Sequence, residues 1–201
     1  MPKDWIKKRK REHYYRKAKK AKYRSRAAYK LLQAVKRYRF MKPGDVVVDL
    51  GAAPGGWTQA SRKIVGSKGF VLGVDLKQVE PFNSSNVKTL IGDIRKPEVA
   101  QQIRGFLPCL ANVVISDVAQ NVSGVWELDH SRQIDLATHS LRIATLVLRP
   151  KGSFFVKTFH GGMLDDFMKL VRQHFAHTKR VKPKASRAKS SESYVLGTKF
   201  E

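Results

Sequence analysis

The chain has 201 residues, which is enough for one domain and too few for two of ordinary size. It contains 40 Lys and Arg against 16 Asp and Glu, giving a formal net charge of +24 that favours a polyanionic partner. A hydrophobic content of 42% excludes an intrinsically disordered chain. The single cysteine, Cys109, excludes an internal disulfide and a cysteine-cluster zinc site, and it fits a cytoplasmic location. Because there is neither a membrane-length apolar run nor a signal-peptide pattern, we expect no membrane association.

The basic charge is concentrated at the two ends of the chain. Residues 1–42 contain 18 Lys and Arg and 2 acids, residues 43–148 contain 10 of each, and residues 149–201 contain 12 and 4. This distribution predicts a small-molecule site in the neutral middle and polyanion contacts at the flanks. We expect residues 1–22 to form an RNA-binding arm ahead of a domain over residues 23–201. A solvated basic arm, disordered until bound, and a targeting signal are the alternatives for this segment.

The hydrophobic pattern alternates between helical and strand periods along the chain. The β-branched run at 46–48 is typical of a buried strand, and Ser25 and Pro97 suit helix starts. In chain order, we expect a helix over Ser25–Tyr38, a strand over Asp45–Leu50, a helix over Gly56–Ile64, strands over Phe70–Leu76 and Val87–Ile91, a helix over Pro97–Phe106, a strand over Asn112–Ser116, a helix over Ser131–Leu148, a strand over Ser153–Phe159, a helix over Met163–Phe175, and strands over Thr178–Lys182 and Tyr194–Lys199. This order predicts an α/β fold with a mostly parallel seven-stranded sheet flanked by helices.

A glycine-rich turn, Gly51-Ala52-Ala53-Pro54-Gly55-Gly56, follows the first expected strand, where α/β proteins commonly bind ligands. A phosphate-binding P-loop needs Gly-Lys-Ser/Thr, and Trp57-Thr58 after Gly56 excludes it. A dinucleotide-binding turn needs glycine where Ala53 stands, which weakens that interpretation. S-adenosylmethionine, which has no pyrophosphate, is the third candidate.

Three carboxylates near successive strand ends favour this third candidate. Asp75 ends the second expected strand, where it could accept bonds from both ribose hydroxyls, and Asp93 follows the third, placed to accept from an adenine amine. Asp49 precedes the turn and could orient the amino-acid end of the cofactor. Carboxylates suit a sulfonium cation and repel a pyrophosphate. The competing interpretation is that each aspartate only caps a strand end.

Five separated segments resemble the FtsJ (RrmJ) family of S-adenosylmethionine-dependent ribosomal RNA ribose 2′-O-methyltransferases. They are Ser25–Leu31, Asp49–Trp57, Ser116–Asn121, Phe155–Lys157 and Ser186–Tyr194. The resemblance runs from about Tyr23 to the C-terminus and implies a Rossmann-like methyltransferase fold. It implies a catalytic set of Lys30, Asp117, Lys157 and Glu192, and cofactor contacts at Gly55, Trp57, Asp75, Asp93 and Asp117. We add Gly51 and Pro54, which belong to the glycine turn, and Asp49, which precedes it, to the expected cofactor site.

The residue types suit methyl transfer to a ribose hydroxyl. A 2′-hydroxyl is a weak acid, so its attack on a sulfonium methyl needs a base or stabilisation of the alkoxide. A lysine can serve as base when a second ammonium lies close by, and we expect Lys30 beside Lys157 to fill that role. Asp117 and Glu192 would orient the two lysines. We therefore expect Lys157 to be the base or the group that orients the hydroxyl.

The resemblance points to large-subunit ribosomal RNA within the ribosomal subunit as the substrate, with uridine as the expected nucleotide, and to a monomeric enzyme without a metal. A transfer RNA substrate is the alternative within the family. An RNA-binding protein without enzymatic activity and an NAD-dependent oxidoreductase are the rivals from other classes. The former leaves the neutral middle and the glycine turn unexplained, and Ala53 and the net charge count against the latter.

Four further features have open interpretations. Gln120 stands where members of the family usually have proline, which puts the geometry of that turn in doubt. His174 and His177 lie three apart on an expected helix without a completing ligand motif. Trp126, Asp129 and His130 are expected on the loop after the fourth strand, as a substrate lip or as ordinary packing. The acid-free basic run over residues 179–189 is either a solvated face or a phosphate contact, and we favour the contact.

Overall fold

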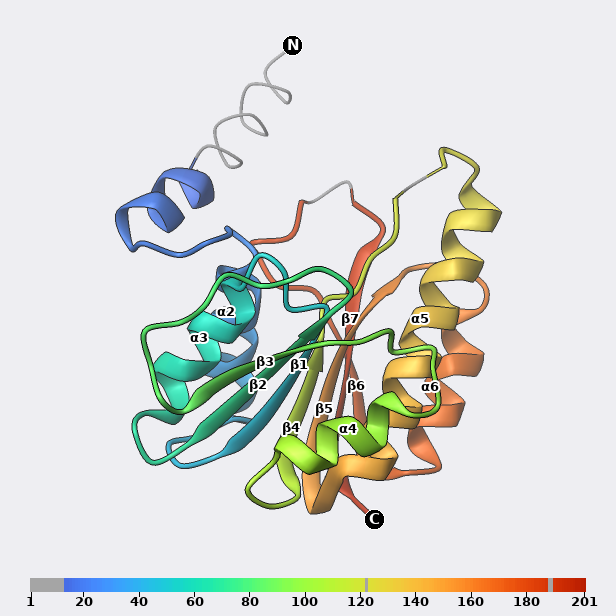
Figure 1. The fold of residues 1–201 in the computed structure, drawn as a ribbon. Helices are drawn as coiled ribbons and strands as arrows, with labels where there is room; N and C mark the ends of the chain where they lie inside the picture. The colour runs from blue at the N-terminus through green and yellow to red at the C-terminus, as the bar shows by residue number, and fades with distance from the viewer. Residues whose placement is uncertain (1–12, 122, 188–189) are drawn as a thin grey trace.

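A single sheet organises the residues that the computed structural model describes, which are 13–121, 123–187 and 190–201 (Figure 1). Within them, seven strands lie in the order β3-β2-β1-β4-β5-β7-β6. Strands β1 to β5 are parallel, and β7 pairs antiparallel with both β5 and β6. Their bounds are β1 Val46–Leu50, β2 Phe70–Asp75, β3 Val87–Ile91, β4 Ala111–Ser116, β5 Leu148–Phe159, β6 Phe175–Val181 and β7 Glu192–Phe200. The predicted α/β fold with a mostly parallel sheet is confirmed.

Helices cover both faces of this sheet, and each face has its own hydrophobic core. One face is covered by α2 (Ala28–Tyr38) and α3 (Gly56–Val65). The other is covered by α4 (Val99–Phe106), α5 (Trp126–Val147) and α6 (Leu164–Arg172) (Figure 1). All five residues of β1 are buried, as the β-branched run predicted. Because β1 to β5 are parallel, their carboxyl ends lie at the same end of the sheet, which is where ligand sites form in sheets of this kind.

The start of α5 differs from the prediction. The helix begins at Trp126 instead of Ser131, so Trp126, Asp129 and His130 lie in its first turns and not on a loop. The helix is capped by a residue of its own first turn. The carboxylate of Asp129 reaches back and accepts hydrogen bonds from the backbone N–H groups of Ser123 and Gly124, at 2.7 and 3.1 Å. These bonds hold the pKa of Asp129 below its usual range. They fix the loop before the helix, which periodicity alone cannot reveal.

Other boundaries differ as well. The predicted N-cap Ser25 lies outside α2, which begins at Ala28 without a side-chain cap. Strand β5 begins at Leu148, where the prediction had the end of a helix. Helix α6 ends at Arg172, so His174 follows the helix and His177 lies in β6. The two histidines therefore do not share a helical face.

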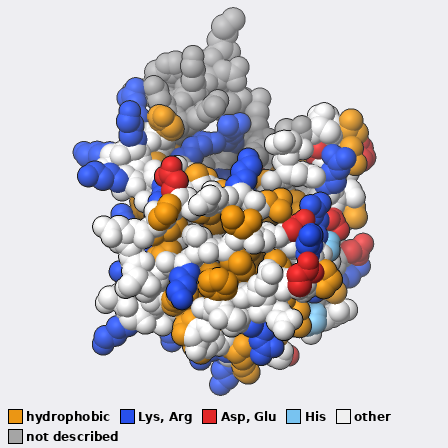
Figure 2. Space-filling view, in the orientation of Figure 1, with side chains coloured by type: hydrophobic (Ala, Val, Ile, Leu, Met, Phe, Trp, Pro, Cys, Tyr) orange, Lys and Arg blue, Asp and Glu red, His pale blue; other side chains and the backbone are white. Residues whose placement is uncertain are grey.

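Part of the predicted arm packs on the domain. Residues 13–20 are helical, and Ala18 is buried. The hydroxyl of Tyr14 accepts a hydrogen bond from Gln33 at 2.9 Å, and the hydroxyl of Tyr29 donates to the carbonyl of Lys17 at 3.1 Å. Lys and Arg side chains gather around this helix at the upper left of Figure 2. The remainder of the arm, residues 1–12, lies outside the described residues. None of the described helices has the length and apolarity needed to cross a membrane.

Candidate active site

A cleft of about 620 Å³ lies at the carboxyl ends of β1, β2, β3 and β4. Its volume is in the usual range for small-molecule sites. Five of the residues predicted to hold the cofactor line the cleft: Gly51, Pro54, Asp75, Asp93 and Asp117. Gln120, the departure from the family pattern, lines it too, and its amide nitrogen is buried without a partner among the described residues. The structure thus brings most of the predicted cofactor residues to one place.

The glycine turn needs its glycines for two different reasons. Gly51 has a φ of 76°, and a Cβ there would lie 2.8 Å from the Cα of Val118, so Gly51 lets the loop after β4 approach closely. Gly55 has a φ of 108° and precedes α3. A Cβ on Gly55 would meet the side chains of Phe82 and Arg24. In the structure, Gly55 therefore borders Arg24 and Phe82 instead of lining the cleft.

The two carboxylates at the far side of the turn are already engaged within the protein. Asp75 accepts hydrogen bonds from the backbone N–H groups of Ala53 and Lys77, both at 2.9 Å, which ties the end of β2 to the glycine turn. Asp93 forms an ion pair with Arg95 at 2.7 Å, and the hydrogen bonds from Arg95 lower its pKa to about 2. An ionised carboxylate has about four lone-pair sites, so Asp75, which accepts two hydrogen bonds, retains acceptor capacity for a ligand. Asp93 already accepts four hydrogen bonds from the backbone and side chain of Arg95, so a ligand would have to replace one of them.

Asp49 and Trp57 lie beneath the turn and do not line the cleft. Asp49 is fully buried; one oxygen accepts a hydrogen bond from Thr58 at 2.6 Å, and the other has no partner among the described residues. Burial, with smaller effects from Asp117 and Asp75, raises the pKa of Asp49 to about 7. The indole of Trp57 is buried and donates to the carbonyl of Ala27 at 2.8 Å. Its side chain supports the helix that carries Lys30.

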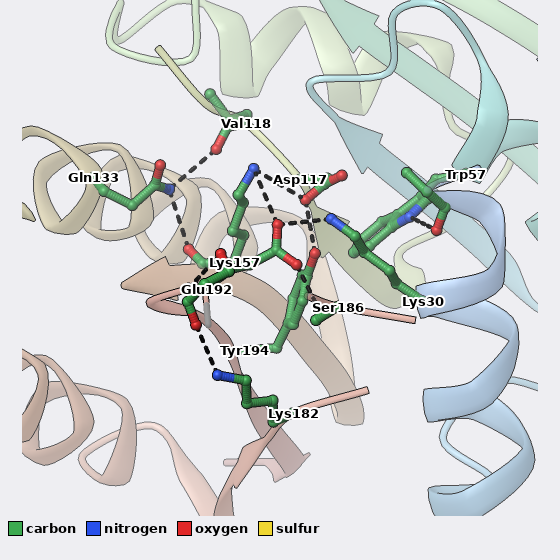
Figure 3. A network of polar contacts seen from close by, with 12 residues as sticks. Lys30, Trp57, Asp117, Val118, Gln133, Lys157, Lys182, Ser186, Glu192 and Tyr194 are labelled. Carbon is green, nitrogen blue, oxygen red and sulfur yellow. Dashed lines mark hydrogen bonds and ion pairs between the residues drawn. The ribbon is translucent and has the colours of Figure 1, made fainter. Parts of the chain in front are cut away.

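The four residues of the predicted catalytic set come together beside the cleft (Figure 3). Lys30 comes from α2, Asp117 follows β4, Lys157 lies in β5, and Glu192 begins β7. The Nζ of Lys30 lies 2.6 Å from Oε2 of Glu192, and the Nζ of Lys157 lies 3.8 Å from the same oxygen. The Nζ of Lys157 also lies 3.5 Å from Oδ1 of Asp117. All four side chains are mostly buried, so water screens these contacts weakly.

Glu192 is the acceptor at the centre of this cluster. Its second carboxylate oxygen accepts a hydrogen bond from the hydroxyl of Ser186 at 2.7 Å. Burial alone would raise the pKa of Glu192, but the charge and hydrogen bond of Lys30, with help from Lys157 and Ser186, hold it below its usual range. Glu192 is therefore ionised at neutral pH and holds the two lysine ammonium groups on one oxygen.

Two buried residues that contact this cluster, Tyr194 and Gln133, are not among the predicted site residues. The hydroxyl of Tyr194 donates to Oδ1 of Asp117 at 3.0 Å, and burial raises its pKa well above the usual value, so it stays protonated. The amide of Gln133, on α5, donates to the carbonyls of Val118 and Lys157 at 3.0 and 3.3 Å. The pairing of β5 with β7 could have pointed to Tyr194, whereas the periodicity of α5 gives no sign of Gln133.

Metal ligands are a separate question. Among the residues that the structure describes, no three His, Cys, Asp or Glu side chains are grouped so that they could hold a metal ion.

Comparisons with known proteins identify the family of the chain. The family model for FtsJ-like methyltransferases matches residues 23–200. The chain is 47% identical over 201 residues to the ribosomal RNA large subunit methyltransferase E of Methanocaldococcus jannaschii, covering 98% of this chain and 82% of the relative. It is 46% identical to the protein of the same name from Methanothermobacter thermautotrophicus, covering 100% of this chain and 95% of the relative.

Solved structures give the same result for the fold. A Plasmodium falciparum protein described as a ribosomal RNA methyltransferase superposes with a TM-score of 0.78 at 25% identity, covering 89% of this chain and 98% of that one. A Clostridium thermocellum protein, 22% identical and with a TM-score of 0.59 over 85% of this chain and 97% of that one, shares the fold. The family model matches residues 23–200, and the relatives are 47% and 46% identical over 98% and 100% of this chain. The chain therefore belongs to the FtsJ-like methyltransferase family.

Proposed function

We propose that this methyltransferase transfers a methyl group from S-adenosylmethionine to the ribose 2′-hydroxyl of a nucleotide in large-subunit ribosomal RNA, with uridine as the expected nucleotide. One observation carries the proposal: Asp117 lines the cleft and also contacts Lys157 at 3.5 Å. The cofactor cleft and the lysine–carboxylate cluster thus share a residue. A hydroxyl held by Lys157 would lie next to a methyl group presented from the cleft.

The residues of the cleft fit S-adenosylmethionine. Three carboxylates line it, those of Asp75, Asp93 and Asp117, against the cationic Lys77 and Arg95. This balance suits a sulfonium cation better than a pyrophosphate. In the proposed site, Asp75 would hold the ribose hydroxyls in addition to its contacts within the protein. Asp93 would hold the adenine amine in place of a hydrogen bond from the exposed side chain of Arg95. When bound, the cofactor supplies an electrophilic methyl group.

The lysine–carboxylate cluster would act on the substrate hydroxyl. Lys157 would hold the 2′-hydroxyl and take its proton or stabilise the developing alkoxide. Glu192 and Asp117 would fix the position of its Nζ, because they contact it from two sides at 3.8 and 3.5 Å. Lys30 adds a second positive charge through the shared oxygen of Glu192. Since the attack is an in-line displacement, this positioning supplies much of the rate.

The choice of RNA rests on charge and on the relatives. The basic flanks of the chain suit a phosphate backbone. The relatives that cover nearly the full chain are named ribosomal RNA large subunit methyltransferase E, which favours large-subunit ribosomal RNA over transfer RNA. We expect a cytoplasmic monomer that acts on ribosomal RNA within the ribosomal subunit.

The test is methyl transfer from labelled S-adenosylmethionine to RNA prepared from cells that lack the protein. Large-subunit ribosomal RNA, whole ribosomal subunits and transfer RNA are offered separately, and the product is digested by nucleases to find the modified nucleotide. A 2′-O-methylated uridine in large-subunit ribosomal RNA is expected. Label on a base, or on transfer RNA alone, would refute the proposal.

A further inference from the structure

Three aromatic side chains stack at the point where α5 begins and β5 ends. The ring of Trp126 lies 5.6 Å from that of His130, at an interplanar angle of 17°, and 6.1 Å from that of Phe159, at 24°. His130 is buried, and its Nε2 accepts a hydrogen bond from the backbone N–H of Met163 at 3.2 Å. Trp126 nevertheless remains 42% exposed. A large ring is thus held by two neighbouring rings and still faces solvent.

The surroundings of Trp126 form a hydrophobic patch. Val125, Leu128 and Met163 are also large hydrophobic residues with exposed side chains, and Met163 is linked to Trp126 through His130. Hydrophobic side chains lie over the N-terminal end of α5 at the upper right of Figure 2. An exposed cluster of this kind usually marks a binding surface.

This patch borders the lysine–carboxylate cluster. Phe159 pairs in register with Glu192 across β5 and β7. Lys157 precedes Phe159 by two residues, so the two side chains share one side of the strand, roughly 7 Å apart along it. The ring of Trp126 lies a further 6.1 Å from that of Phe159, so Lys157 and Trp126 are within the span of a few nucleotides of an extended strand. His160, which follows Phe159, lies 3.1 Å from the exposed guanidinium of Arg180, so a positive charge stands at the same strand end.

We propose that Trp126 is a stacking platform for an unpaired nucleobase of the substrate RNA, close to the nucleotide that is methylated. The proposal rests on the proposed function, which places RNA at Lys157. An aromatic ring that is held in place by its neighbours can stack with any of the four bases, because every base has a π-face. Guanidinium groups close to such a ring bind the phosphates. Phe159 connects the platform to the strand that carries Lys157, and Arg180 supplies a charge for the backbone.

The test compares two RNA-like probes that differ only in their bases. One is a short oligouridylate, whose bases are unstacked and available, and the other is a matched oligomer in which tetrahydrofuran replaces every base. Trp126→Ala should weaken oligouridylate binding by about fivefold to a hundredfold and leave binding of the base-free oligomer unchanged. Trp126→Phe should retain most of the affinity. Leu146→Ala, at the exposed far end of the same helix, is the matched control and should change neither affinity.

A fluorescence measurement tests the native ring directly. The chain has three tryptophans. In a Trp5→Phe background, the remaining two are Trp57, which is buried, and Trp126, which is exposed. Oligouridylate should protect this fluorescence from acrylamide, and the base-free oligomer should not. Equal protection by both, or equal oligouridylate affinity of Trp126→Ala and the unmutated protein, would overturn the proposal and leave the patch as a protein-binding surface. Base-dependent binding without methyl transfer would refute the proposed reaction and not this site.

Discussion

Lys157 and Tyr194 face each other in register on β5 and β7, and the polar ends of both side chains reach Oδ1 of Asp117. The protonated hydroxyl of Tyr194 donates to this oxygen at 3.0 Å, while the Nζ of Lys157 lies 3.5 Å away. The aspartate at the edge of the cleft is therefore held by a neutral donor and a cation at once. This arrangement fixes the carboxylate relative to both the cleft and the lysine.

Replacing Lys157 tests the proposed chemistry. Lys157→Ala removes the base or orienting group and leaves the glycine turn, Asp75 and Asp93 in place. We expect the rate of methyl transfer to fall by about 10²–10⁴, the usual contribution of a positioned acid–base group. Affinities for S-adenosylmethionine and for RNA, measured by calorimetry and by filter binding, should stay within a few-fold. Substantial methyl transfer by this variant would contradict the mechanism.

Four companion substitutions separate the roles within the cluster. Lys157→Arg should also be inactive, because a guanidinium does not release a proton near neutral pH. Lys30→Ala and Glu192→Ala should lose less activity, since these residues act through Lys157. Asp117→Ala should weaken cofactor binding as well as the rate, because Asp117 lines the cleft. Equal losses for all five variants, with cofactor binding intact, would argue for a structural cluster.

The carboxylates of the cleft can be tested one at a time. Asp75→Ala and Asp93→Ala should each weaken S-adenosylmethionine binding by roughly 1–3 kcal/mol, the usual cost of an unpaired buried polar group. Asp75→Ala also removes the acceptor for the N–H of Ala53, so we expect it to have the larger effect. Arg95→Ala is the control for Asp93, because it removes the ion pair and keeps the carboxylate. Calorimetric affinities close to those of the unmutated protein would remove these residues from the site.

Asp49 should make the stability of the protein depend on pH. Its pKa is about 7 in the folded chain and about 3.9 in an unfolded one, so between these values the folded state binds one more proton. The free energy of unfolding contributed by this group therefore falls as the pH rises from about 4 to about 7. Asp49→Asn should remove that part of the slope, measured by denaturant unfolding at several pH values. An unchanged slope would show that Asp49 ionises normally.

Two truncations distinguish the charge of the arm from its packing. Removing residues 1–12 deletes six Lys and Arg. It should weaken RNA binding and reduce the log–log salt slope by up to about four, at roughly 0.7 for each phosphate contact to single-stranded RNA. Removing residues 1–20 also deletes the helix that packs on Tyr29 and Gln33, so it should in addition slow methyl transfer through Lys30. If the shorter truncation changes neither affinity nor slope, residues 1–12 do not bind RNA.

The fold and much of the site could be predicted because their signals are local. The buried β-branched strand, the glycine turn and the strand-end aspartates occur within short stretches, and they predicted the sheet and most of the cleft. Asp49, Gly55 and Trp57 do not line the cleft, because the sequence does not say on which side of a turn a residue is buried. The start of α5 was missed because Asp129 caps it from within. Contacts between distant segments, such as that between Gln133 and Lys157, have no local pattern.

Gln133 links the segments that follow the paired parts of β4 and β5. Strands β4 and β5 pair up to Ser116 and Val156, and beyond that point the segments carrying Asp117 and Lys157 are bridged by the amide of Gln133. Gln133→Met keeps the volume of the side chain but removes both hydrogen bonds, leaving the carbonyls of Val118 and Lys157 without this donor. We expect a loss of stability of about 1–3 kcal/mol, and a lower kcat with little change in the KM for S-adenosylmethionine.

A general loss of packing would not produce this separation between kcat and KM. Ser140→Ala provides the comparison, because Ser140 is also buried on α5 but bonds to Ser116, which lies within the sheet. It should lower stability while leaving kcat unchanged once the protein is folded. If Gln133→Met and Ser140→Ala lower stability and activity in the same proportion, Gln133 only supports the fold. If kcat falls for Gln133→Met alone, the two hydrogen bonds of Gln133 position the side chains of Asp117 and Lys157 relative to each other.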